Sequence, residues 1–105
     1  FTTFAWTLDD IAPQVDAACE GGWTTEKLLQ VGERIWNMER MFNNRAGFTA
    51  ADDKLPERLV KDAAKTGPAK GLVNGLDKML PEYYELRGWT SDGVPTNETL
   101  DRLAL

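Results

Sequence analysis

The chain has 105 residues, of which 42% are apolar and 28% are charged, a composition typical of one folded domain and not of a disordered segment. Its 12 basic and 17 acidic residues give a net charge of −5, and because this charge repels phosphate backbones we expect no nucleic-acid partner. No apolar run approaches the roughly 18 residues that a transmembrane helix requires, and no signal peptide opens the chain, so we expect a cytoplasmic protein without membrane contact.

The first predicted helix begins after Thr7, which forms an acidic variant of the capping box with Asp10. Apolar residues then recur at helical spacing as far as Cys19. Gly21-Gly22 ends the pattern, because glycine adopts the left-handed cap conformation at little cost. Pro13 lies deep in this segment and is expected to kink the helix or delay its start.

The second and longest predicted helix begins at Thr24 or Thr25 and ends before Gly47. Its apolar residues recur at intervals of three and four, which indicates an amphipathic helix. Trp36 and Met38 broaden the apolar stripe, so we expect this helix to pack on more than one side. The apolar set consists of Leu28, Leu29, Val31, Ile35, Trp36, Met38, Met41 and Phe42.

Two short elements and a loop are predicted next. Thr49 and Asp52 form a second threonine–aspartate box, which is enough for a single turn. Pro56 suits the first position of a short helix that continues through Val60. Residues 65–75 contain three glycines and one proline, a composition that predicts an ordered loop.

Two further helices are predicted, Leu76–Arg87 and Thr96–Leu103, and Pro81 limits how early regular hydrogen bonding can begin in the first of them. The predicted fold is therefore all-α: one compact domain of four to five helices with an ordered Gly/Pro loop and no significant sheet. One segment leaves an alternative open, because the apolar and aromatic residues Phe1–Trp6 would suit a strand by propensity.

Few residues could carry chemistry. The chain has no histidine, which excludes histidine-based catalysis and the commonest metal ligand. Cys19 is the one cysteine, so neither an internal disulfide nor a cysteine-rich metal site can form, and we expect an inert thiol on a helix face. Gly67–Gly71 (GPAKG) lacks the spacing of a phosphate loop and is predicted to be a surface turn. The adjacent carboxylates Asp52-Asp53 fall short of a calcium site.

Glu82 and Glu85 flank two tyrosines, Tyr83 and Tyr84. Residues three apart share one helix face, where a carboxylate pair could serve as acid and base. Surface helices carry such pairs very commonly, and we expect a solvated face with buried tyrosines.

Two other groups of residues have structural interpretations. The tryptophans are expected to be core anchors: Trp23, Trp36 and Trp89. Charged residues could form a ladder along the second helix: Arg34, Glu39 and Arg45. We therefore predict no catalytic, cofactor-binding or metal-ligating residue in this chain.

Two blocks of sequence resemble a known family. One is GERIWNMERMFNNRAGFTAADDKLPERL at residues 32–59, and the other contains GPAKG, LDKMLPEYYELRGW and DGVPT between residues 67 and 96. Their order and spacing closely resemble the C-terminal end of the tungsten-containing aldehyde:ferredoxin oxidoreductase family. The resemblance extends from Trp23 to Leu105, with a weaker extension to Phe1.

This resemblance implies that residues 1–105 are the C-terminal helical domain of a larger enzyme, which oxidises aldehydes to carboxylic acids and passes electrons to ferredoxin. Such enzymes hold tungsten, or sometimes molybdenum, between two pterins beside one 4Fe-4S cluster, under a β-rich N-terminal domain. The pterin motif and all four cluster cysteines would precede Phe1. We therefore expect no cofactor and no activity in this chain alone, whose partners would be the remaining domains of the parent enzyme.

The resemblance also bears on individual residues. Cys19 does not replace a cluster ligand, because it precedes Gly21-Gly22, where relatives carry a shorter join. Phe1–Phe4 would lie near the pterin and the cluster and could form a dry wall around them, although a simple helix-packing lead-in explains them equally well. Arg45 and Arg58 are candidates for locking the domain against its neighbours.

Two other functions remain open: a free-standing helical protein-interaction module with no catalysis, and a small independent enzyme that uses carboxylates. The chain does not begin with methionine, which suggests a piece of a longer protein. Such a piece exposes its former interdomain surface. We expect an apolar patch around Phe1, Phe4 and Trp6 that supports self-association.

Overall fold

A computed structural model of the chain describes residues 5–105, and its regular elements are all helices. The one extended pairing among these residues is a single antiparallel bridge between Trp89 and Pro95, so the all-α prediction is confirmed. The strand alternative falls mostly on Phe1–Phe4, which lie outside the described residues. The elements are α1 (Leu8–Ala18), α2 (Thr25–Arg45), the 3-10 turn η2 (Ala50–Asp52), α3 (Glu57–Lys61), α4 (Leu76–Arg87) and α5 (Asn97–Leu103).

The helix starts follow from short polar signals, as predicted. The backbone N–H of Thr7 donates to the Asp10 carboxylate at 2.8 Å, and the backbone N–H of Thr49 donates to Asp52 in the same way at 2.9 Å. The Thr24 hydroxyl accepts the backbone N–H of Lys27 at 3.3 Å at the start of α2. These bonds satisfy N–H groups that have no partner inside the helix. Pro13 lies inside α1 without delaying the start of that helix.

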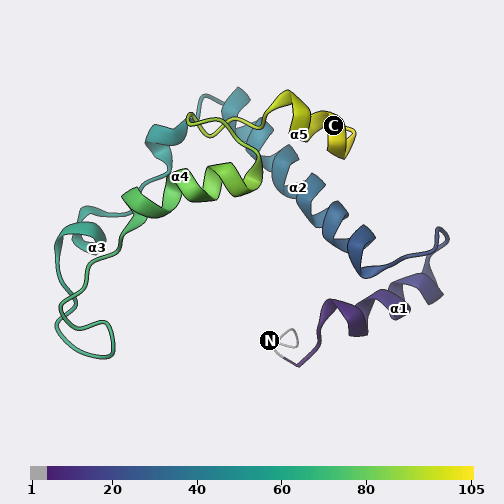
Figure 1. Cartoon of the computed structure of the whole chain (residues 1–105), viewed down its shortest axis with the longest axis horizontal. Coiled ribbons are helices and arrows are strands. Elements are labelled where there is room, and N and C mark those ends of the chain that lie inside the picture. Colours follow the sequence, from purple (N-terminus) through teal and green to yellow (C-terminus); the bar gives the residue numbers. More distant parts are fainter. Residues whose placement is uncertain (1–4) are drawn as a thin grey trace.

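The helices are arranged around α2, the longest of them (Figure 1). α1 packs against the N-terminal part of α2, and α5 also contacts α2. α4 diverges from α2, and α3 with its following loop projects outward as an arm (Figure 1). The radius of gyration is consequently 18.0 Å, above the value of about 13 Å that a compact domain of this length has.

The loop between α3 and α4 is closed by its own backbone hydrogen bonds. The N–H of Ala64 donates to the carbonyl of Leu72 at 2.9 Å, and the N–H of Gly71 donates to the carbonyl of Ala64 at 2.8 Å. Residues 65–74 are exposed, so the GPAKG segment is the surface turn that its sequence predicts. No helix in the described part of the chain is both long and apolar enough to cross a membrane.

The face of α2 that is buried is its polar one. Asn37 is fully buried and Arg40 is only 9% exposed, whereas Trp36 and Met38 are 46% and 47% exposed. α2 packs against both α1 and α5, but most of its apolar stripe stays exposed in the described chain. The physical reason is that Asn37 and Arg40 bind the segment before α5, which leaves the apolar side of the helix outward.

Candidate functional site

Arg40, in the middle of α2, is the centre of the most buried polar cluster among the described residues. Its Nη1 and Nη2 donate to the two carboxylate oxygens of Asp53 at 2.8 and 2.6 Å, and its Nε donates to the carbonyl of Gly93 at 2.6 Å. A bidentate pair of this kind fixes both distance and orientation. Arg40 therefore joins α2 to the segment after η2 and to the turn before α5.

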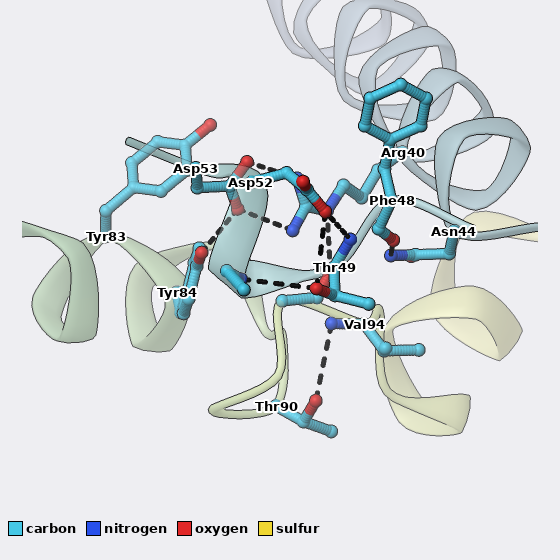
Figure 2. Close-up of polar contacts among 12 residues, drawn as sticks. Arg40, Asn44, Phe48, Thr49, Asp52, Asp53, Tyr83, Tyr84, Thr90 and Val94 are labelled. Atoms are coloured by element: carbon cyan, nitrogen blue, oxygen red, sulfur yellow. Dashed lines mark hydrogen bonds and ion pairs between the residues drawn. The ribbon is translucent and has the colours of Figure 1, made fainter. Parts of the chain in front are cut away.

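Two aromatic residues complete this cluster. The hydroxyl of Tyr84, on α4, donates to the Asp53 carboxylate (Figure 2). The guanidinium carbon of Arg40 lies 4.9 Å from the centre of the Trp89 ring and 5.9 Å from that of the Tyr84 ring. Both distances allow a cation–π attraction. The arginine is thus surrounded by one carboxylate, one carbonyl and two aromatic rings.

Asn37 extends the cluster one helical turn toward the start of α2. The indole N–H of Trp89 donates to Asn37 Oδ1 at 2.8 Å, and Asn37 Nδ2 donates to the carbonyl of Glu33 at 2.9 Å. A buried indole N–H or side-chain amide without a partner is costly. This pairing allows Trp89 to serve as the core anchor that the sequence predicts.

Gly93 makes the close approach of Arg40 possible. It has φ +70°, and a Cβ at this position would overlap the Nη2 of Arg40. The turn that carries it is closed by a hydrogen bond from the N–H of Gly93 to the carbonyl of Thr90 at 2.8 Å. Glycine is therefore required here both by the backbone conformation and by the space that the guanidinium occupies.

The pKa values of the cluster shift in the directions that this geometry dictates. The hydrogen bonds from the Arg40 guanidinium lower the pKa of Asp53, and the bond from Tyr84 lowers it further. Burial raises the pKa of Tyr84 to about 12, and its hydrogen bond to the charged Asp53 contributes to this rise. Asp53 is thus held ionised and Tyr84 protonated at neutral pH, so neither is suited to exchange protons there.

The end of the chain is fastened to α2 by a second set of contacts. Arg102 forms a bidentate ion pair with Glu33, and this hydrogen bonding lowers the pKa of Glu33. Arg34 donates to the carbonyls of Leu103 and Ala104. These bonds hold α5 along α2, and Leu103 is fully buried between them.

An open cavity of about 380 Å³ borders the cluster. The indole N–H of Trp36 donates to the Tyr83 hydroxyl at 2.8 Å at its edge. Its lining combines aromatic, aliphatic and carboxylate side chains, among them Trp36, Asp53, Leu76, Leu80, Tyr83 and Tyr84.

The structure gives the predicted carboxylates different roles. Asp52 caps the turn at Thr49, whereas Asp53 pairs with Arg40, so both members of this pair are already engaged. Glu82 and Glu85 are exposed, while Tyr84 is buried and Tyr83 is half-buried. The solvated face predicted for these two glutamates is confirmed.

The predictions for tryptophans and cations have mixed outcomes. Trp89 is buried, but Trp23 is only partly buried and Trp36 is half exposed, so the core-anchor prediction is wrong for Trp36. The expected ladder of Arg34, Glu39 and Arg45 does not form, because Arg34 is engaged by the last carbonyls of α5. The locking role of Arg45 and Arg58 stays a prediction.

Arg40, the central residue of the cluster, was not predicted from the sequence. A usable signal existed: Glu33, Asn37, Arg40 and Asn44 recur at intervals of four, three and four. That spacing places them on one face of a helix. A polar stripe opposite an apolar one is ordinarily interpreted as the solvent side, and only the partners Asp53 and Gly93 reveal that it is buried here.

A metal centre needs several ligating side chains close together. Residues 5–105 contain no group of three histidine, cysteine, aspartate or glutamate side chains that could hold a metal ion. Cys19 is exposed, and Asp53 is occupied by Arg40. These residues do not fit a tungsten or iron–sulfur site. The segment Phe1–Phe4, suggested as a wall near a cofactor, lies outside the described residues.

Comparison with known proteins gives one consistent family. Residues 1–105 match the family described as aldehyde ferredoxin oxidoreductase, domains 2 and 3. Tungsten-containing aldehyde ferredoxin oxidoreductases of Pyrococcus furiosus and Pyrococcus abyssi are each 47% identical to the chain over 106 residues, and that of Thermococcus kodakarensis is 45% identical. Each alignment covers 100% of this chain, which spans only 18% of the length of these relatives.

One solved structure has the same helical arrangement. It is a chain of the active site complex BamBC of benzoyl coenzyme A reductase, determined in complex with 1,5-dienoyl-CoA. The TM-score is 0.77 at 31% sequence identity, and the match covers 95% of this chain and 14% of the other. The open arrangement of helices thus recurs inside a much longer polypeptide.

The pH dependence of stability should report the cluster. Because the pKa of Asp53 is lowered on folding, its stabilisation is present above about pH 4 and is lost as pH falls through the lower folded value. The pKa of Tyr84 is raised to about 12, so its contribution is present below about pH 10 and is lost between about pH 10 and 12. Urea unfolding followed by circular dichroism gives the free energy of unfolding at each pH. Asp53→Asn should reduce the loss of stability at acid pH, and Tyr84→Phe should reduce the loss at alkaline pH. An unchanged pH dependence in both variants would contradict the assignment.

The close approach at Gly93 has a matched control. Gly67 has φ +79° but open space around it. Gly67→Ala should therefore lower the free energy of unfolding by only about 1 kcal/mol, because alanine is strained in the left-handed conformation. Gly93→Ala must also displace the guanidinium and break its pairing, and we expect it to cost about 2 kcal/mol more than the control. Urea midpoints of the two variants measure this difference. Equal losses would show that Arg40 moves aside without penalty.

Proposed function

Because this chain belongs to the aldehyde ferredoxin oxidoreductase family, we propose that it is the C-terminal helical domain of a tungsten-dependent enzyme that oxidises aldehydes to carboxylic acids. The observation that carries the proposal is the match of the entire chain, at 47% identity, to enzymes named for that activity. The 18% share of their length is what a single domain of such an enzyme would span.

In this proposal the cofactor belongs to the parent enzyme and is held by other parts of it. We infer a tungsten, or molybdenum, bis-pterin and one 4Fe-4S cluster, which would supply the two-electron chemistry that side chains lack. The support for tungsten is that the relatives matched over the whole chain are named tungsten-containing. No reaction step is assigned to its residues.

The chain would contribute a stiff wall that encloses the cofactor. Arg40 fastens α2 to the segments that carry Asp53 and Gly93, and Tyr84 brings α4 to the same point. These bonds keep α2, α4 and the two bound segments at fixed distances from one another. A site enclosed by such a fixed surface excludes water from the reaction. The remaining domains, the aldehyde and a ferredoxin would be the partners of the parent, which we place in the cytoplasm.

The parent enzyme tests this proposal directly. Assembled with metal under anaerobic conditions, it should oxidise aldehydes with a ferredoxin or a viologen dye as electron acceptor. Removal of residues 1–105 should abolish the activity, through loss of folding and of cofactor retention measured by metal analysis. A parent that binds tungsten yet oxidises no aldehyde with either acceptor would contradict the assigned reaction.

The exposed glutamates of α4 provide a separate prediction. Glu82→Gln and Glu85→Gln in the parent should each leave kcat within about tenfold of the unmodified enzyme. The reason is that both residues are exposed in this chain, whereas removal of a general acid or base typically costs about a hundredfold or more. Steady-state kinetics on metal-matched samples make the measurement. A thousandfold loss with metal and fold retained would place chemistry in this domain.

A further inference from the structure

The apolar residues of α2 form one narrow stripe. Val31, Ile35, Met38 and Phe42 follow one another at intervals of four, three and four. At about 100° per residue they point within about 40° of a common direction, and they extend about 16 Å along the axis. These four residues are called the α2 stripe below.

The α2 stripe is not covered by any other part of the described chain. Val31, Ile35, Met38 and Phe42 are 37%, 48%, 47% and 72% exposed. Phe42 and Met38 also border a cavity of about 380 Å³ together with Glu39 and Asn43. An exposed row that ends in a phenylalanine, with a hollow beside it, has the character of an interaction surface and not of scattered surface residues.

The helix cannot turn this stripe inward. Arg40 and Asn37 lie about 180° to 240° around the axis from the stripe, and their bonds to Asp53, Gly93 and Trp89 fix that opposite face. Rotation of α2 to bury Phe42 would leave the Arg40 charge and the Asn37 amide without partners, which is costly in a buried site. The outward direction of the stripe is therefore built into the fold.

We propose that another part of the same polypeptide packs on the α2 stripe and covers it with an uncharged apolar face about 16 Å long. The inference rests on the proposed function, because it takes the chain as one domain of a longer enzyme. Two lengths support the occupant: the relatives extend far beyond the 18% that this chain spans, and a chain of which the match covers 14% contains the same arrangement. A side chain from that face fits the hollow between Met38 and Phe42.

A photo-crosslinker in the full-length parent tests the occupant. p-Benzoylphenylalanine replaces Phe42, which it resembles in shape, and a control variant carries it at the exposed Gln30, about 100° away from the stripe on the same helix. Irradiation should join position 42 to a peptide outside the 105 residues while the denatured product keeps the mass of one chain, and position 30 should not join that peptide. A product of twice the chain mass would assign the stripe to a second copy and overturn the proposal. No crosslink, or one within the 105 residues, would overturn it as well.

Oxidation of Met38 by hydrogen peroxide in the unmodified parent is the independent measurement, because the crosslinker variant could fail to fold. In the native enzyme Met38 should be oxidised at least tenfold more slowly than in the guanidinium-unfolded enzyme, as measured by peptide mass spectrometry. Slowing of less than tenfold would mean that the stripe is open to solvent, against the proposal. Aldehyde oxidation is assayed on the same sample, so a covered stripe without activity counts against the proposed function alone, and activity with an open stripe counts against this inference alone.

Discussion

The pairing of Arg40 with Asp53 is the interaction on which the arrangement of the other elements depends. One guanidinium meets the carboxylate after η2 and the carbonyl of Gly93, and the same carboxylate accepts the hydroxyl of Tyr84 from α4. A largely buried ion pair of this kind gains little net stability, because desolvation of both charges offsets their attraction. Removal of any one partner, however, leaves a charge uncompensated. The cluster therefore selects one arrangement of these elements, but it adds little to the free energy of unfolding.

The apolar interior is too small to hold these elements by itself. The buried apolar side chains within residues 5–105 are Ala12, Tyr84, Trp89 and Leu103, and two of them reach hydrogen-bond partners in the cluster. The hydrophobic term that usually dominates folding is correspondingly modest here. Directional polar bonds fix the positions of α2, α4 and α5, and much of the apolar surface stays outside.

Local signals allowed the helices to be predicted, but not the site. Thr7, Thr24 and Thr49 each bind a backbone or carboxyl partner within three residues, so the sequence order contains all the needed information. Arg40 differs, because Gly93 lies 53 positions away, and only the fold brings them together. The periodicity of α2 correctly indicated an apolar and a polar face, but periodicity does not specify which neighbour covers each face. For this reason the burial of the polar face of α2 was not predicted from the sequence.

The two faces of α2 are mechanically linked, because a helix rotates as one body. The bonds of Arg40 and Asn37 fix the angle of α2 about its axis, and that angle sets the direction in which Ile35, Met38 and Phe42 point. A register change of one residue would turn the apolar row by about 100° and away from anything packed on it. The buried arginine thus sets the direction of surface side chains that it does not touch. In the proposed enzyme, a chain without histidine and with one exposed cysteine would contribute in this way: it would hold an apolar row in a fixed direction, while the reacting groups would come from other parts of the polypeptide.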